Sequence, residues 1–198
     1  MMKPNALATR AIILGLLALM LGGCGAVVIG GAVATANVAH DRRTAGTLVE
    51  DQKILLEAIS MRDADDALKK QANVGIDVFN LQVLLTGQAE NFEVVEAFRQ
   101  RVAGIQRVRA VFNEVTVGAE STWSEATADA YLTARVKVAL FNVKIDGFDP
   151  TRVTVTSSQG SVYLMGLLTP TEADAVTEEV RFVSGVKRVV KLFEYIDR

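Results

Sequence analysis

Val162-Tyr163-Leu164-Met165-Gly166-Leu167 is a short apolar run with one glycine inside it, and it follows the turn signal Ser158-Gln159-Gly160. Apolar runs of this length next to a turn are typical of buried β-strands, and a Gly-containing turn predicts a hairpin. Val83-Leu84-Leu85-Thr86-Gly87 repeats the pattern 79 positions earlier, counted from Val83 to Val162. The chain therefore contains one unit twice, at a spacing too long for a solenoid repeat.

The residues around each hairpin give the rest of the unit. Before each hairpin, apolar residues recur at the helical period; they are Ile54, Leu55, Ala58 and Ile59 in the first copy, and Leu132, Val136, Ala139 and Leu140 in the second. Strands are predicted at 74–80 and 82–88, and at 152–157 and 161–168. A second helix is predicted at 91–102 and 171–183, and a last strand at 108–117 and 186–196.

Each copy therefore has the order αββαβ. Because a helix connects the second strand to the third, those two strands should be parallel, with a right-handed crossover. The predicted fold class is α+β, with two tandem domains. Each domain is expected to hold a three-stranded mixed sheet with two helices on one face.

A second match lies near the end of each copy. Ala103-Gly104-Ile105-Gln106-Arg107-Val108 aligns with Ser184-Gly185-Val186-Lys187-Arg188-Val189 at an offset of 81, counted from Gly104 to Gly185. Both glycines are expected to end the second helix of their copy. The spacing from the strand glycine, 17 residues in copy one and 19 in copy two, predicts a shorter helix or turn in the first copy.

The first 24 residues have the features of an export signal. Lys3 and Arg10 precede an apolar run of 11 residues, 11–21, which is shorter than the ~20 residues that a membrane-spanning helix needs. Leu21-Gly22-Gly23-Cys24 then resembles the lipobox of bacterial lipoproteins. The alternative is an uncleaved anchor helix, which the six glycines within 15–31 disfavour. We expect a signal peptide at 1–23, acylation of Cys24 and a tether at 24–46.

Composition excludes most catalytic chemistry. Cys24 and His40 are the only cysteine and the only histidine, so an internal disulfide is excluded. A zinc site built on several Cys or His ligands and a nucleophile–histidine pair are nearly excluded. Removing residues 1–23 takes away Lys3 and Arg10 and changes the formal net charge from −2 to −4, which argues against nonspecific nucleic-acid binding.

Carboxylates are the remaining candidates for chemistry. Asp63, Asp65 and Asp66 cluster after the first helix of copy one, and Asp146 and Asp149 occupy the corresponding loop of copy two. Neither stretch has the spacing of a calcium loop, so both are interpreted as solvated loop acids that mark helix ends. We expect no enzyme activity, no cofactor and no metal site.

The double unit, its central glycine and the Gly-Val-Lys-Arg-Val stretch resemble the BON domain, named for bacterial osmotically induced and nodulation proteins. The resemblance covers residues 51–196. Together with the lipobox and Asp41-Arg42-Arg43-Thr44-Ala45-Gly46, it resembles the dual-BON-domain outer-membrane lipoproteins. It implies a first domain at 47–118, a linker at 119–127 and a second domain at 128–198. It also implies a lipid-anchored position on the periplasmic face of the outer membrane.

The resemblance further implies that the first helix of the second domain, here about 125–141, binds anionic phospholipid. With the apolar positions turned inward, Tyr131, Arg135, Val138 and Asn142 form its outward stripe, and Lys137 and Lys144 lie near it. The implied phospholipid-binding residues are Tyr131, Arg135, Lys137 and Val138.

Two functions follow as expectations. The first is a non-enzymatic factor that binds anionic lipid and supports outer-membrane integrity, with a role at division sites. The alternative is a protein-interaction adaptor for an envelope machine such as the barrel-assembly complex, which would pair with an open strand edge. Salt separates them, because contact between cations and phosphate weakens as ionic strength rises, whereas strand pairing does not.

Overall fold

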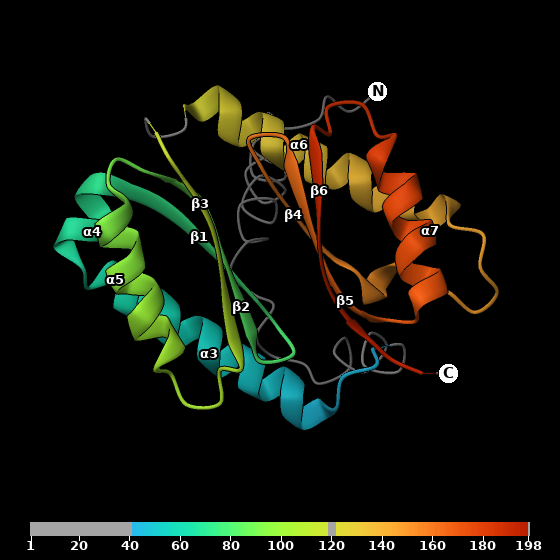
Figure 1. The fold of residues 1–198 in the computed structure, drawn as a ribbon, viewed down its shortest axis with the longest axis horizontal. Coiled ribbons are helices and arrows are strands. Elements are labelled where there is room, and N and C mark those ends of the chain that lie inside the picture. The colour runs from blue at the N-terminus through green and yellow to red at the C-terminus, as the bar shows by residue number, and fades with distance from the viewer. Residues whose placement is uncertain (1–40, 119–121, 198) are drawn as a thin grey trace, which may run out of the picture. The chain divides into compact units, whose positions relative to one another are not determined.

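The computed structural model describes residues 41–118 and 122–197; the leader, Cys24 and His40 lie outside these ranges. The first unit comprises α3 (Ala45–Asp63), α4 (Asp66–Gln71), β1 (Ala72–Phe79), β2 (Gln82–Ala89), α5 (Phe92–Ala103) and β3 (Ala110–Val117) (Figure 1). The second comprises α6 (Trp123–Ala139), the 3-10 turns η2 (Leu140–Asn142) and η3 (Pro150–Arg152), β4 (Thr154–Ser158), β5 (Ser161–Leu168), α7 (Pro170–Arg181) and β6 (Arg188–Tyr195). The predicted order αββαβ is confirmed in both copies, with the short helix α4 added in the first.

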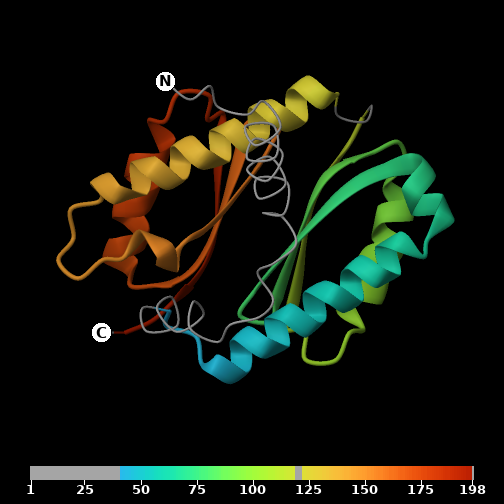
Figure 2. The same cartoon turned by 180° about the vertical axis from the view of Figure 1, so that it is seen from behind.

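Both sheets have the predicted mixed topology. β2 pairs with β1 in antiparallel and with β3 in parallel orientation, and β5 pairs in the same way with β4 and β6. In each unit the two long helices lie on one face of the sheet, α3 and α5 on the first and α6 and α7 on the second (Figure 2). The predicted fold class is therefore confirmed.

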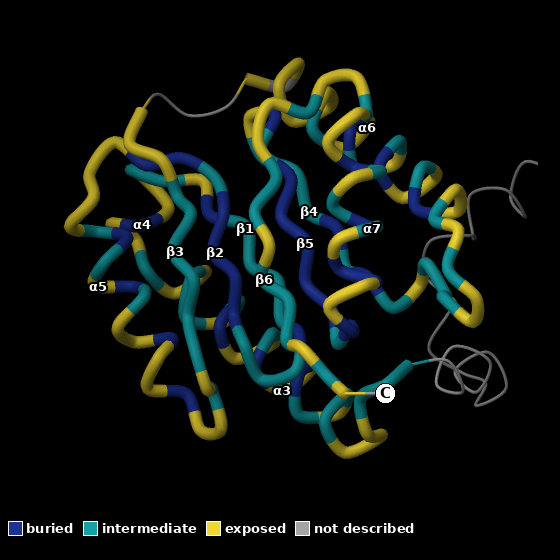
Figure 3. The backbone as a smooth tube through the Cα atoms, turned by 45° about the vertical axis from the view of Figure 1, so that its right-hand side comes forward, coloured by how far each residue is buried: buried dark blue, intermediate teal, exposed yellow. Residues whose placement is uncertain are grey.

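The helices pack on the sheets through the predicted apolar positions. Ile54 and Ala58 are buried in the core of the first unit, and Leu132, Val136 and Leu140 in that of the second. A third buried cluster joins the opposite faces of the two sheets, through Phe79, Leu84, Tyr163 and Met165. Because β2 and β5 are covered on both faces, they are buried along most of their length (Figure 3). This explains why their sequences are continuous apolar runs and do not alternate.

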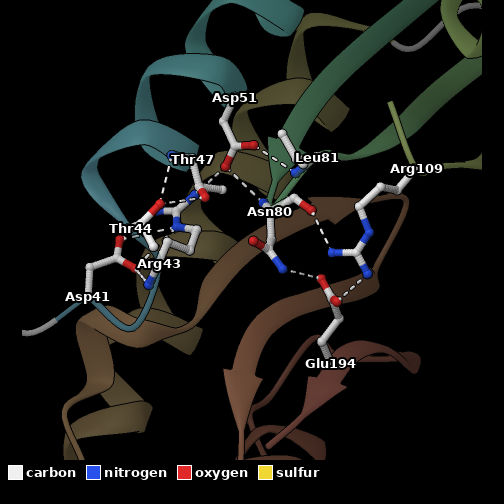
Figure 4. Close-up of polar contacts among 9 residues, drawn as sticks. All are labelled: Asp41, Arg43, Thr44, Thr47, Asp51, Asn80, Leu81, Arg109 and Glu194. Atoms are coloured by element: carbon white, nitrogen blue, oxygen red, sulfur yellow. Dashed lines mark hydrogen bonds and ion pairs between the residues drawn. The ribbon is translucent and has the colours of Figure 1, made fainter. Parts of the chain in front are cut away.

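One aspartate on the first long helix of each unit, α3 or α6, fixes the hairpin turn of that unit. The Asp51 carboxylate accepts hydrogen bonds from the backbone N–H groups of Asn80 and Leu81, at 2.8 and 2.7 Å (Figure 4). Asn80 and Leu81 both have positive φ, 50° and 65°, which is the backbone that a two-residue hairpin turn requires. Asp51 therefore holds a turn whose own residues do not favour it.

Asp129 repeats the arrangement in the second unit, where its carboxylate accepts from the N–H groups of Gln159 and Gly160 at 2.8 and 3.2 Å. The repeated aspartates thus have one structural role, at equivalent positions of α3 and α6.

The alignment of Gly104 with Gly185 is wrong. α5 and α7 both have 12 residues, so the helix of the first copy is not shorter, and its preceding turn is one residue longer. Gly104 caps α5 as expected, but Phe182 is the residue that caps α7. Gly185 has φ 99° in the following turn, the position that Arg107 occupies in the first copy with φ 73°. Pairing the two glycines by residue type displaces the alignment of the two copies by three residues.

Candidate functional site

An exposed apolar surface lies on α6 and at the end of α7. Tyr131, Val138 and Phe141 are 66%, 69% and 73% exposed, and Phe182 is 74% exposed. These four residues are called the α6–α7 surface below. α6 begins at Trp123, two residues before the expected start, and ends at Ala139, so that Phe141 lies in the 3-10 turn η2. Large exposed apolar side chains gathered on one face are typical of a contact surface.

Tyr131, Arg135 and Val138 lie together, as the sequence predicts. With Phe182 they line an open groove of about 540 Å³ between α6 and the end of α7. The Arg135 guanidinium lies 5.7 Å from the centroid of the Tyr131 ring, and that of Arg181 lies 4.4 Å from the Phe182 ring. The rings of Tyr131 and Phe182 therefore each have a cation beside them, an arrangement that stabilises the pair by about 0.5–1 kcal/mol at an exposed site.

Lys137 lies on the opposite flank of α6. It lines a second groove of about 350 Å³ together with Phe141, Pro150, Thr151, Val153 and Thr154. Val138 thus shares the first groove with the cationic residue Arg135, and Phe141 shares the second groove with the cationic residue Lys137. The structure does not bring all four sequence-predicted residues into one groove.

The Lys137 charge also reaches a carboxylate of the first unit. Burial raises the pKa of Asp77 above its ordinary value of 3.8, although a hydrogen bond with Thr156 and the positive charge of Lys137 oppose this shift. A carboxyl whose pKa is raised by folding favours the folded state while it is protonated, and this contribution is lost as pH rises through the folded-state pKa.

Asp77→Asn is therefore expected to raise the midpoint of thermal unfolding at neutral pH, because the amide keeps the hydrogen bond to Thr156 and needs no charge in a buried position. The gain should disappear below about pH 3, where Asp77 is protonated in both states. Thermal scans of both proteins from acid to neutral pH check this. A variant that is less stable at neutral pH would show that the Asp77–Lys137 attraction outweighs the burial.

Phe141, Arg181 and Phe182 were not among the sequence-predicted site residues. A signal for Phe182 was present, since the core residues Ala173, Val176 and Val180 define the buried face of α7 and residue 182 falls off it. No local pattern indicates that Phe182 joins Tyr131, because the two lie 51 positions apart on different helices.

The first unit provides an internal comparison for this surface. With Asp51 aligned to Asp129, the positions of Tyr131, Val138 and Phe141 are occupied by Lys53, Ser60 and Asp63. Arg135 aligns with Glu57, and the cap position of Phe182 aligns with Gly104. The duplicated fold thus carries aromatic and apolar side chains at these positions in the second copy only, and the first copy has its cation, Lys53, at the position of Tyr131.

Four of the five loop carboxylates, Asp63, Asp65, Asp66 and Asp149, have structural partners among the described residues. Asp65 caps α4 by accepting from the N–H groups of Ala67 and Leu68, and it pairs with Arg101. The pKa of Asp65 is lowered chiefly by the Leu68 N–H, with burial opposing and Arg101 assisting. Asp149 accepts from the Thr151 N–H at the start of η3. Within the described part of the chain, no group of three or more potential ligand residues is placed to hold a metal ion.

The BON domain model matches this chain twice, over residues 56–119 and 128–197. The chain belongs to the BON-domain family. It is 35% identical to the outer membrane lipoprotein DolP of Haemophilus influenzae over 197 residues, which is 99% of this chain and 100% of that protein. It is also 34% identical to a 21 kDa hemolysin of Actinobacillus pleuropneumoniae over 158 residues, 79% of either chain. Among solved structures, the Chlamydia trachomatis type III secretion protein CdsD aligns with a TM-score of 0.30 and 12% identity, over 75% of this chain and 92% of that one.

Similarity to the lipoprotein member of the BON family over nearly the whole chain identifies the present chain as an outer-membrane lipoprotein that is held by a lipid anchor. Cys24, the residue expected to carry the acyl chains, lies outside the described residues. Over 41–118 and 122–197, none of the helices has the length and apolar character that a membrane span needs.

Proposed function

We propose that this lipoprotein is a non-enzymatic envelope factor whose second BON domain binds anionic phospholipid through the α6–α7 surface, and that it supports outer-membrane integrity and acts at division sites. The observation that carries the proposal is the comparison of the two copies. At the positions of Tyr131, Arg135 and Val138, the first domain has Lys53, Glu57 and Ser60. The fold alone does not require an apolar and cationic face at these positions.

The chemistry of the α6–α7 surface suits the boundary of a lipid bilayer. Exposed apolar side chains at Val138, Phe141 and Phe182 can enter the headgroup layer, and full burial of such a side chain is worth about 1.5–3 kcal/mol. Arg135, Lys137 and Arg181 can meet phosphate while their stems stay on the protein, and each cation near an anionic surface adds about 1 kcal/mol. Such a contact is weak by itself and is strengthened when the acyl anchor already holds the protein at the membrane.

Tyr131→Glu is expected to lower partitioning of the unacylated mature protein onto vesicles that contain phosphatidylglycerol by about tenfold, which corresponds to ~1.4 kcal/mol. It removes an interfacial aromatic ring and places a negative charge beside Arg135. Co-sedimentation with vesicles, with and without the anionic lipid and at low and high salt, measures the effect. Binding of the unchanged protein should fall as salt rises.

A matched control lies in the first domain. Leu56 is 58% exposed on α3, and Leu56→Glu makes a comparable change away from the α6–α7 surface. It should leave vesicle binding unchanged, whereas Phe182→Ser should weaken it. Equal partitioning onto neutral and anionic vesicles, or no loss in Tyr131→Glu, would contradict the proposal.

The alternative, an adaptor for an envelope assembly machine, stays a prediction. β3 and β6 each pair with one strand only within their sheets, so each has an edge at which another chain could add a strand. Crosslinking in intact cells from residues of β3 and from α6 would separate the alternatives. Protein adducts from β3 without lipid-dependent adducts from α6 would favour the adaptor.

A further inference from the structure

Arg42, which lies near the end of the expected tether 24–46, binds the second domain. Its Nη1 and Nη2 atoms donate to the two carboxylate oxygens of Glu172 at 2.6 and 2.8 Å, and Nη1 also donates to the Leu167 carbonyl at 2.9 Å. Glu172 is only 5% exposed and completes the capping box at the start of α7. This bidentate geometry is the strongest form of a charge-assisted hydrogen bond between side chains.

Arg43, the next residue, binds the first domain. Its Nη1 atom donates to Asp51 at 2.9 Å, and its guanidinium lies 4.1 Å from the centroid of the Phe79 ring. Its other nitrogens donate to Asp41, so the arginine is held on both sides (Figure 4). Asp51 is 5% exposed and is the residue that caps the hairpin turn at Asn80 and Leu81.

Within the described ranges, two further ion pairs join the domains. Arg109 pairs with Glu194, to which the Asn80 side chain also donates, and Arg188 pairs with Glu114. The arginine side chains of these pairs are 49% and 53% exposed, whereas those of Arg42 and Arg43 are 26% and 15% exposed. Exposed pairs contribute little, but a buried pair that loses one partner leaves an uncompensated charge.

We infer that residues 41–44 form a clasp between the two BON domains, in which Arg42 holds the second domain and Arg43 the first. Arg42 and Arg43 are adjacent in the chain. They can contact the buried carboxylates of Glu172 and Asp51 at the same time only while the two domains keep one relative arrangement. Residues 41–44, at the end of the expected tether, are thus part of the folded pair of domains and limit how far the domains can separate.

The state of Glu172 supports the clasp. Burial alone would raise the pKa of this carboxyl, but the hydrogen bonds and charge of Arg42, together with the N–H and hydroxyl of Thr169, lower it overall below the ordinary value of 4.5. Glu172 is therefore anionic at neutral pH and is a full partner for Arg42.

The clasp is tested on the unacylated mature protein without lipid, so that the result does not depend on the proposed function. Cys24 is first replaced, and one cysteine is then introduced in each domain at an exposed position, Ser60 in the first and Asp174 in the second. Each introduced cysteine carries a spin label. Pulsed dipolar spectroscopy then gives the distribution of distances between the domains. Arg42→Ala is expected to widen this distribution at least twofold, and Glu172→Gln, which keeps an N3 residue that can complete the capping box, should do the same.

Matched controls separate the clasp from general destabilisation. Glu125 completes the same capping box at the start of α6, and within the described residues no arginine contacts it, so Glu125→Gln should leave the distribution narrow. Glu172→Gln also weakens the pair that Glu172 makes with Arg152 of the second domain at 3.8 Å. The double variant Arg42→Ala, Glu172→Gln should therefore be no wider than Glu172→Gln alone, because the Arg42–Glu172 contact can be removed only once. An unchanged distribution in Arg42→Ala, or equal widening in Glu125→Gln, would overturn the clasp.

Discussion

In a Cys24→Ala variant, the protein is expected to leave the membrane-anchored pool almost completely. Acyl chains hold a protein at a bilayer because each buried CH₂ contributes about 0.8 kcal/mol, and more than one chain gives stable attachment. The contact proposed for the α6–α7 surface is much weaker and cannot replace them. Fractionation of envelopes into inner membrane, outer membrane and soluble periplasm, followed by detection of the protein, measures the loss.

The comparison with Tyr131→Glu makes this prediction specific. That variant keeps Cys24 and should stay in the outer-membrane fraction, although its vesicle binding is reduced. The two substitutions therefore separate anchoring from lipid contact. Outer-membrane residence of Cys24→Ala at the level of the unchanged protein would show that the acyl chain is not the anchor.

Asp51→Ala is expected to lower the free energy of unfolding by about 3 kcal/mol, because one carboxylate has three roles. It accepts the two N–H groups of the turn at Asn80 and Leu81, and it pairs with Arg43. Its removal leaves the partly buried Arg43 with one carboxylate partner fewer, since Asp41 still pairs with it, and leaves a turn with positive φ without its cap. For a chain of this size the loss corresponds to roughly 6–12 °C in the unfolding midpoint, measured by circular dichroism.

Asp129→Ala is the matched control, since Asp129 caps the equivalent turn of the second domain, and no arginine of the described ranges pairs with it. One of its turn residues is Gly160, which adopts positive φ without strain. The expected loss is therefore about 1 kcal/mol. Equal losses in the two variants would mean that the Arg43 pair adds nothing to the stability of the first domain.

Local patterns in the sequence predicted most of the architecture. The apolar periodicity around Ile54 and Leu132 and the runs that begin at Val83 and Val162 indicated helices and strands correctly in both copies. These predictions succeed because a side chain that faces a core recurs at the period of its own helix or strand, within a few residues along the chain.

The alignment of residues 103–108 with 184–189 failed for a physical reason. Gly104 and Gly185 are the same residue type, but backbone conformation defines which positions of the two copies are equivalent. Arg107 adopts in the first copy the left-handed conformation that Gly185 adopts in the second. A non-glycine residue can be held at positive φ by the structure around it, so a glycine alone does not mark the position.

The candidate surface was only half visible in the sequence. The α6 stripe with Tyr131 and Val138 follows from helical spacing, and the internal repeat shows that the first domain lacks it. Phe182 belongs to the same surface only because α7 packs beside α6 on one face of the sheet. Lys137 was grouped with Arg135, yet the curvature of the helix surface puts the two cations in different grooves.

The sequence by itself determined that this protein has a lipobox-like leader, two copies of one αββαβ unit and no cysteine–histidine chemistry. Tertiary structure alone decided that Arg42 meets Glu172, 130 positions away, and that Arg43 meets Asp51. The reason is that helical and strand periodicity acts over a few residues, whereas a buried ion pair depends on which sheet faces pack together. That packing is set by Phe79, Leu84, Tyr163 and Met165 from both domains, and no local pattern indicates it.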